Sequence, residues 1–202
     1  MVGVAPGSSS AQVQTALRTH DVGSVIFLGG WTGATTVKST AEKLQAAAPG
    51  PDLLVAADQE GGAVQQLKGT GFTTLPNALR QGSLERTTLR TQAEGLGREL
   101  AAAGVNVDLA PVADTVAADF AARNGPIGKY SRQYGSDPAA VADDVATVVD
   151  GLQSTGVVAT AKHFPGLGRV SGNTDSTAAG ITDEVTTATD PYLVPFQRAI
   201  AH

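Results

Sequence analysis

Residues 53–62, LLVAADQEGG, join a short apolar run to a cluster of polar residues. Four more short apolar runs lie at residues 1–4, 24–28, 105–110 and 157–161, and Gly, Pro or Asp bounds each of them. Short, nearly continuous and partly β-branched runs of this kind are typical of strands buried on both faces, as in a parallel sheet covered by helices. The sequence therefore predicts five buried strands.

Longer amphipathic stretches separate these runs. The clearest predicted helix follows Asp137, an N-cap, carries Pro138 in its first turn and ends before Gly156; its apolar positions are Val141, Val145, Val148 and Leu152. Ser83 is predicted to cap a second helix that ends at Gly104. Weaker helical patterns cover residues 11–19, 37–47 and 191–201.

The resulting order is strand then helix, repeated five times, with no linker or repeat that divides residues 1–202. Such alternation predicts a single α/β domain with a parallel sheet and right-handed crossovers. Two architectures fit this order. Five units complete an open doubly wound sheet, but they are only part of a (β/α)8 barrel of about 250 residues. The unit count alone favours the open sheet.

Composition excludes several classes of protein. Of the 202 residues, 42% are hydrophobic and 16% charged, which is typical of a globular chain, and the net charge of −5 argues against nucleic-acid binding. No apolar run reaches the roughly 20 residues of a membrane span, and the stretch after Met1 lacks a signal-peptide pattern. With no cysteine and three scattered histidines, we expect neither a metal site nor another cofactor.

Polar side chains follow the last three predicted strands. Asp58 and, two positions later, Glu60 follow the third strand; Asp114 and a long loop to Arg132 follow the fourth; Lys162, His163 and a loop containing Asp175 follow the fifth. Ligands of both architectures bind at the carboxyl ends of the strands. Basic groups and carboxylates that converge there suit the neighbouring hydroxyls of a sugar. The alternative is a purely structural Asp58–Lys162 charge pair that closes the end of the barrel.

A phosphate-binding loop is a weaker interpretation. Residues 166–169, GLGR, follow a strand, but Ser171 stands where G-x-G-x-x-G requires a third glycine, and no helical pattern follows. The sequence also contains no Walker A motif and no G-x-S-x-G nucleophile elbow. An open-sheet phosphate-binding protein is therefore supported by strand count alone.

Several motifs in order resemble one known family. Residues 58–62 (DQEGG), 106–114 (NVDLAPVAD), 131–138 (SRQYGSDP) and 162–166 (KHFPG) are similar to the signatures of glycoside hydrolase family 3, in its β-N-acetylhexosaminidase branch of the cell-wall recycling type. Residues 22–27 resemble the second strand of that family. The likeness extends through nearly the whole chain. It implies a (β/α)8 barrel of the TIM type, of which this chain holds the first five β-α units.

The resemblance also implies a function and a site. Asp58, Arg132, Lys162 and His163 would hold the hydroxyls of a terminal N-acetylglucosaminide, and a retaining mechanism would use an aspartate nucleophile on a later strand, beyond residue 202. The family's proton donor is a histidine in an Asp-x-His pattern, where this chain has Asp175 and Thr177. Either Asp175 alone donates the proton or the donor lies elsewhere. Asp183 and Asp190 are poor substitutes for the nucleophile, and Asp190 is predicted to cap the last helix.

Two further expectations follow. We expect this chain alone to be inactive, and the first and fifth strands to have open edges that a longer chain, a second chain or self-association covers. A non-catalytic carbohydrate-binding or regulatory module that kept the pocket is the alternative function, because the nucleophile is missing and Thr177 stands in the histidine position.

Overall fold

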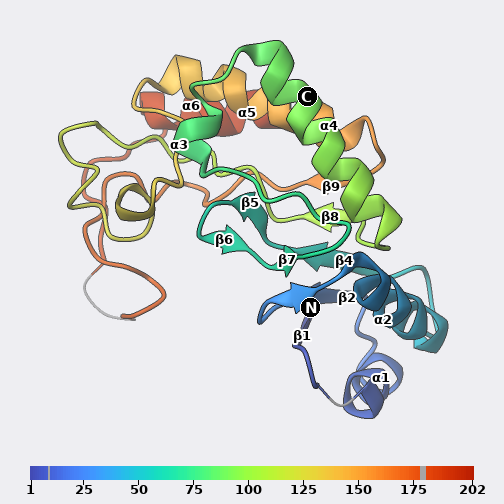
Figure 1. Ribbon diagram of the computed structural model, residues 1–202. Helices are drawn as coiled ribbons and strands as arrows, with labels where there is room; N and C mark the ends of the chain where they lie inside the picture. Colours follow the sequence, from blue (N-terminus) through green and yellow to red (C-terminus); the bar gives the residue numbers. More distant parts are fainter. Residues whose placement is uncertain (9, 178–180) are drawn as a thin grey trace.

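The computed structural model describes residues 1–8, 10–177 and 181–202 and contains one five-stranded parallel sheet (Figure 1). Its strands are β1 (Val2–Val4), β2 (Ser24–Phe27), β4 (Leu54–Ala57), β8 (Val107–Asp108) and β9 (Val158–Ala159). Each strand pairs in parallel with the one that precedes it in this series. A doubly wound sheet reverses its strand order at a switch point, whereas a barrel adds each strand beside the last. The topology is therefore that of a barrel, and the open sheet favoured by the unit count is wrong.

The two faces of the sheet differ in burial. Val25, Phe27 and Val55 lie at 2% exposure or less, in one hydrophobic cluster with residues of the helices. On the other face, Leu54 and Val158 are each 51% exposed. The prediction that both faces are buried is wrong for these two positions, although Ala56 and Val107 on the same face lie at 0% and 7% exposure.

In the described part of the chain, five α-helices of seven residues or more accompany the strands. They are α1 (Ser10–Thr19), α2 (Ala34–Ala47), α4 (Arg86–Ala102), α5 (Pro138–Gln153) and α6 (Val194–Ile200). In Figure 1, α4, α5 and α6 lie side by side along one part of the sheet, and α1 and α2 lie along the other. The Asp137 side chain accepts a hydrogen bond from the Ala140 N–H at 2.8 Å, which confirms the predicted cap of α5.

The predicted Ser83 cap is wrong. Helix α4 begins after Glu85, and the Ser83 hydroxyl donates to the Arg80 carbonyl at 2.7 Å. Ser83 is held there because a short helix, α3 (Ala78–Gln81), with Asn77 as its N-cap, ends two positions before it. Near the other end of the chain, Asp190 accepts from the Tyr192 N–H at 2.8 Å, so it is an N-cap as predicted, but it caps the 3-10 helix η2 (Pro191–Leu193) that precedes α6 and not α6 itself.

The DQEGG stretch forms a small excursion after β4. Strand β5 (Gln59–Gly61) pairs with β6 (Val64–Gln65), and β7 (Leu67–Lys68) pairs with β3 (Trp31–Thr32). The Gln59 amide donates to the Leu67 carbonyl at 2.8 Å and accepts from its N–H at 3.0 Å. A side chain at Gly61 (φ +93°) would place Cβ 2.4 Å from the Pro76 carbonyl oxygen, so only glycine fits. This packing holds Glu60 in a fixed position.

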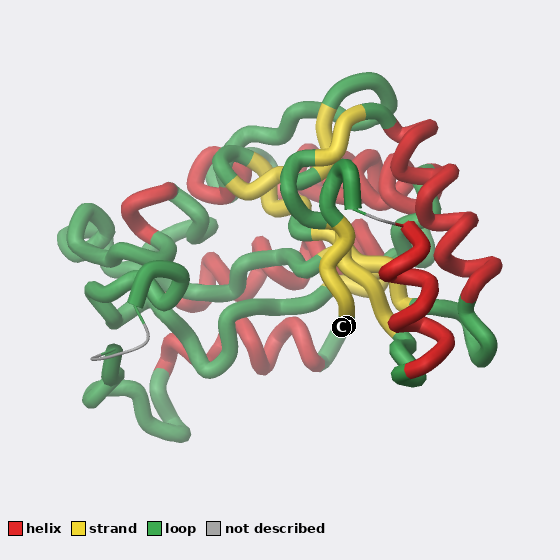
Figure 2. Tube along the Cα trace, turned by 90° about the horizontal axis from the view of Figure 1, so that it is seen from below, coloured by secondary structure: helices red, strands yellow, loops and turns green. Residues whose placement is uncertain are grey.

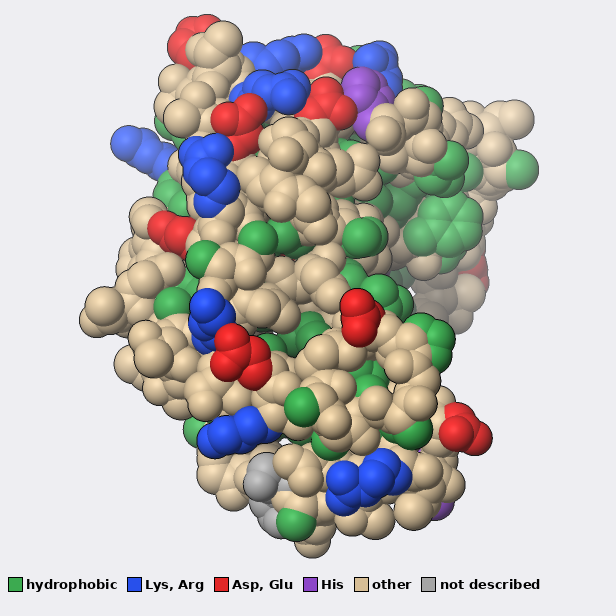
Figure 3. All heavy atoms as spheres, turned by 90° about the vertical axis from the view of Figure 1, so that its right-hand side faces the viewer, with side chains coloured by type: hydrophobic (Ala, Val, Ile, Leu, Met, Phe, Trp, Pro, Cys, Tyr) green, Lys and Arg blue, Asp and Glu red, His purple; other side chains and the backbone are tan. Residues whose placement is uncertain are grey.

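Charged side chains interleave on the outer surface of α4, α5 and α6. Arg86 and Arg198 both pair with Asp143, at 3.1 and 3.6 Å, and join the three helices. Figure 3 looks onto the right-hand side of Figure 1 and shows acidic and basic side chains alternating near its top. Exposed pairs of this kind contribute at most about 1 kcal/mol each. In the described ranges, no helix is long and apolar enough to span a membrane.

Candidate functional site

The residues after β4, β8 and β9 meet at the carboxyl edge of the sheet. In Figure 1 the long connections after β8 (yellow-green) and β9 (orange) lie together at the left, and Figure 2 shows loops gathered on the same side. The Gly125 N–H donates to the Ser171 carbonyl at 3.2 Å and joins the two connections. The sheet therefore brings polar residues from distant parts of the chain together.

Lys162 lies between two carboxylates. Its Nζ forms an ion pair with Asp58 Oδ1 and lies 2.6 Å from Glu60 Oε1. The Glu60 side chain is only 3% exposed. Burial raises the pKa of Glu60, but the hydrogen bond from Arg132 and the charges of Lys162 and Arg132 outweigh burial and lower it overall. The predicted Asp58–Lys162 pair is thus present, as part of a larger network.

Arg132 lies on the connection after β8, just beyond the 3-10 helix η1 (Gly128–Tyr130). Its Nε and Nη2 donate to the two oxygens of Glu60 at 2.8 and 2.6 Å, and its Nη1 donates to the Pro126 carbonyl at 2.9 Å. Burial lowers the pKa of Arg132, but the contact with Glu60 outweighs burial and raises it. A bidentate pair of this kind fixes the plane of the guanidinium.

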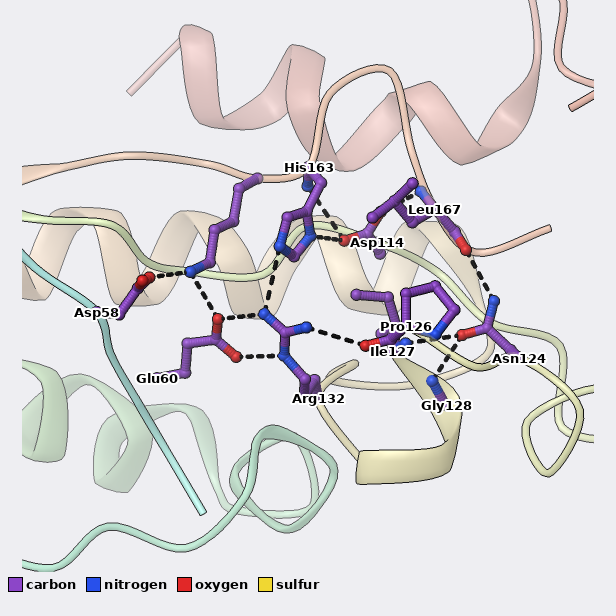
Figure 4. A network of polar contacts seen from close by, with 11 residues as sticks. Asp58, Glu60, Asp114, Asn124, Pro126, Ile127, Gly128, Arg132, His163 and Leu167 are labelled. Carbon is purple, nitrogen blue, oxygen red and sulfur yellow. Dashed lines mark hydrogen bonds and ion pairs between the residues drawn. The ribbon is translucent and has the colours of Figure 1, made fainter. Parts of the chain in front are cut away.

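His163 continues the network on the other side of Arg132. Its Nε2 lies 3.3 Å from Arg132 Nη2, and its Nδ1 lies 2.6 Å from Asp114 Oδ2. Figure 4 shows the resulting chain of contacts, which runs from Asp58 through Lys162 to Glu60 and then through Arg132 and His163 to Asp114. One hydrogen-bonded row of charged and polar groups therefore runs along the edge of the sheet.

One cleft of about 410 Å³ collects the predicted site residues. Asp58, Arg132, Lys162, His163 and Asp175 all line it. The side chains of Asp58 and His163 are 22% and 28% exposed, so a ligand can reach them. Asp175 lies on the exposed loop after β9, with its N–H donated to Asn173 Oδ1 at 2.9 Å. The other lining residues are Val64, Gln66, Leu109, Pro126, Leu167 and Thr174.

Asp108 lies behind the cleft and is fully buried. Its Oδ1 accepts from the Gln59 N–H at 3.1 Å, and its Oδ2 has no hydrogen-bond partner among the described residues. Burial raises the pKa of Asp108 to about 7, although the Gln59 hydrogen bond and the charge of Lys162 oppose this. An uncharged carboxyl group is thus favoured under the site at mildly acidic pH.

Asn124 holds two connections beside the cleft together, and the sequence did not predict this. It is completely buried; its amide nitrogen donates to the carbonyls of Leu167 and Val170 at 2.7 and 2.8 Å, and its oxygen accepts from the N–H groups of Ile127 and Gly128. It ties the connection that carries Arg132 to the loop that leads to Asp175. A single asparagine in a loop without periodicity gives no signal in the sequence.

The chemistry of the cleft suits a polyhydroxylated ligand. Lys162 and Arg132 only donate hydrogen bonds, and Asp58 accepts them, so hydroxyls, which do both, match this set. Asp58 and Glu60 converge on the cation of Lys162, and no group of three metal-ligating side chains occurs in residues 1–8, 10–177 and 181–202. Asp183 and Asp190 are engaged elsewhere, Asp183 within its own turn and Asp190 with Arg169 at 2.7 Å.

Known proteins resemble this chain over its full length. The family model described as glycosyl hydrolase family 3 N terminal domain matches residues 1–202. A β-hexosaminidase of Stenotrophomonas maltophilia (strain K279a) is 34% identical over 219 aligned positions, covering 100% of this chain and 60% of that protein. The β-hexosaminidase LpqI of Mycobacterium tuberculosis is 34% identical over 175 positions, covering 86% of this chain and 43% of that protein.

Solved structures agree with the fold. The β-N-acetylhexosaminidase of Beutenbergia cavernae superposes with a TM-score of 0.90 at 43% identity, over 99% of this chain and 62% of that one. NagZ of Neisseria gonorrhoeae, solved with N-trifluoroacetyl-D-glucosamine, gives 0.80 at 27% identity, over 98% and 58%. The chain spans about 60% of the length of the Stenotrophomonas relative. From its ordered motifs, its barrel topology and these matches, the chain belongs to glycosyl hydrolase family 3, whose N-terminal domain it matches throughout.

Proposed function

We propose that the protein to which this chain belongs hydrolyses terminal β-N-acetylglucosamine residues with retention of configuration. The observation that carries the proposal is that Asp58, Arg132, Lys162 and His163 line one cleft. Relatives of this chain are named β-hexosaminidase, and a neighbour was solved with an N-acylated glucosamine, which supports the same class of substrate. The cleft residues would bind the sugar hydroxyls at the bond to be cleaved.

Retaining hydrolysis requires a nucleophile on one face of the anomeric carbon and a proton donor near the leaving oxygen. Asp175 is the candidate donor, because it is the predicted acid that lines the cleft. The nucleophile is expected beyond residue 202. These residues alone would therefore bind a sugar without cleaving it.

The test uses the protein as its gene encodes it and a series of aryl N-acetyl-β-glucosaminides. We expect turnover, with the β anomer as the first product by NMR. Asp58→Ala should weaken sugar binding by roughly 2–4 kcal/mol, because a charged hydrogen bond is lost and Lys162 keeps only one carboxylate partner. Binding is measured by calorimetry, and a large loss of stability with unchanged binding would make Asp58 a scaffold residue.

Asp175→Asn tests the proton donor in the same assay. General acid catalysis contributes typically 10²–10⁴-fold. We expect a loss of about that size for a poor leaving group such as an alkyl alcohol, and a much smaller loss for dinitrophenol, which leaves without protonation. Equal losses for both substrates would exclude Asp175 as the acid.

A non-catalytic sugar-binding module is the second candidate, favoured by Thr177 in the position of the family's histidine. It predicts that the gene-encoded protein binds N-acetylglucosamine and that no aryl glycoside is turned over. That outcome would contradict the proposed hydrolysis and support the cleft as a sugar-binding site without catalysis.

A further inference from the structure

Asp114 does not line the cleft but contacts two residues that do, His163 and Leu167. Its side chain is completely buried, and three N–H-bearing positions surround it. Its Oδ1 accepts from the Leu167 N–H at 2.6 Å, and its Oδ2 accepts from the backbone N–H of His163 at 3.1 Å and lies 2.6 Å from His163 Nδ1. Backbone N–H groups can only donate, so both oxygens of Asp114 act as acceptors.

The two neighbours of the His163 ring impose one protonation pattern. Asp114 accepts at the Nδ1 side, which requires a proton on Nδ1. On the other side, Arg132 Nη2 lies 3.3 Å from Nε2, and a guanidinium has no acceptor. A proton on Nε2 would therefore face another N–H, so Nε2 must present its lone pair.

We propose that Asp114 is a positioning residue that holds His163 as the neutral Nδ1–H tautomer, so that His163 meets the substrate as a hydrogen-bond acceptor through Nε2. The role toward substrate rests on the proposed sugar-binding function of the cleft. The tautomer itself is a property of the free protein.

This tautomer sets the hydrogen-bonding pattern of the cleft. Lys162 and Arg132 donate, while Asp58 and His163 Nε2 accept. A hydroxyl that enters between Arg132 and His163 accepts from the guanidinium and donates to the ring, and so replaces their direct contact. A hydroxyl oriented in this way distinguishes a sugar from an analogue with fluorine at the same position, because fluorine cannot donate.

A merely structural role for Asp114 makes a different prediction. Asp114 also joins the segment after β8 to the loop after β9, where the Ala113 N–H donates to the Lys162 carbonyl at 2.6 Å. If this connection were its whole contribution, replacing Asp114 would lower stability and leave the His163 tautomer unchanged.

The experiment is long-range ¹H–¹⁵N NMR of the gene-encoded protein labelled with ¹⁵N-histidine, at about pH 7.5, which is above the ordinary histidine pKa of roughly 6.5. The His163 signals are assigned by their absence in His163→Gln. We expect a protonated Nδ1 and an unprotonated Nε2 in the wild type. An Nε2–H tautomer or an imidazolium would overturn the proposal. This result depends neither on the folding of any variant used as a functional test nor on sugar binding.

The variant Asp114→Asn provides a second test, in which both the His163 tautomer and the sugar affinity are measured. An asparagine cannot accept at both positions, so we expect loss of the uniform Nδ1–H tautomer and weaker binding of N-acetylglucosamine, by roughly ten- to a hundredfold. Asp190→Asn is the matched control, since Asp190 is a buried carboxylate with a backbone N–H and an arginine partner but no contact to His163. An unchanged tautomer and unchanged affinity in Asp114→Asn would overturn the proposal. A loss of binding with the tautomer intact would also do so.

Discussion

Asp108 is a buried carboxyl group that makes stability depend on pH. Burial raises its pKa to about 7 from an ordinary value of 3.8, so the folded state binds a proton that the unfolded chain has released. The contribution of this raised pKa to the free energy of unfolding is complete below about pH 4 and is lost as the pH rises through 7. Asp108→Asn stays neutral throughout. From pH 5 to pH 8 the wild type should lose roughly 2–3 kcal/mol more unfolding free energy than this variant.

Urea unfolding of both proteins at the two pH values measures this difference. The histidines and the other carboxylates titrate in both proteins, so the comparison isolates Asp108. The same pH dependence in wild type and variant would mean that Asp108 ionises in the folded state as it does in water.

The predictable residues of the site are those that directly follow a strand. Asp58, Lys162 and His163 each follow an apolar run. The carboxyl ends of parallel strands lie at one edge of the sheet, so such positions come together regardless of the conformation of the loops. Asn124 and the Asp114–His163 contact were not predictable in this way. The partners that join separate loops, Leu167 for Asn124 and His163 for Asp114, lie more than 40 positions away along the chain, where no periodic pattern connects them.

Helices α4 and α5 pack closely through a glycine. A Cβ at Gly151 in α5 would lie 2.6 Å from Ala93 Cβ and 3.2 Å from the Arg90 carbonyl oxygen of α4. Gly95 in α4 has nothing within 4 Å of such an atom. Gly95→Ala should therefore stabilise the protein by about 1 kcal/mol through helix propensity. Gly151→Ala should destabilise it by roughly 1–3 kcal/mol, because the helices must move apart.

Urea midpoints of the two variants at one pH test the packing, and each substitution is the control for the other. If both replacements stabilise the protein equally, the two helices are not in contact at Gly151. If both destabilise it, then Gly95 also meets a neighbour.

At the scale of elements, the sequence predicted those with a long or strongly apolar pattern. All five strands of the main sheet lie within the predicted runs, although β8 and β9 keep only two residues each, and helix α5 begins at the predicted residue. Strands β3, β5, β6 and β7 have two or three residues each, too few for a periodicity, and their pairing depends on tertiary contacts. Ser83 satisfied the preference for a cap but lies beside the end of α3, whose short pattern was not predicted.

On the scale of the whole molecule, the exposed apolar residues on one face of the sheet have a measurable consequence. Leu54 and Val158 are each half exposed, and within the described ranges β1 and β9 pair on one side only. A chain of these 202 residues produced by itself should self-associate, since open edges beside an apolar face recruit further strands. Light scattering across a range of concentrations measures the mass.

Val158→Lys should reduce this association by placing a charge on this face of the sheet. Val185→Lys is the control, because Val185 is 59% exposed but lies in the connection before η2, away from the sheet. A chain that stays monomeric at every concentration would argue against the sheet as an association surface.

Neither composition nor periodicity distinguishes the open doubly wound sheet from the barrel. Both predict five strands alternating with helices, and they differ only in which strands are neighbours. Strand order is a long-range property, and counting units favoured the open sheet. The ordered motifs favoured the barrel, and the pairing of each strand with its predecessor agrees with them.

That strand order also bears on how the protein is made. As the chain leaves the ribosome, each strand of the main sheet finds its partner among residues already synthesised, so the sheet can grow from the N-terminus without waiting for later segments. The charges of the cleft are different, because Lys162 follows Asp58 by 104 positions. At a synthesis rate of about 5–20 residues per second, Lys162 is added roughly 5–20 s after Asp58 and Glu60. A chain that stalls before residue 162 therefore holds Asp58 and Glu60 without the lysine that lies between them in the folded protein.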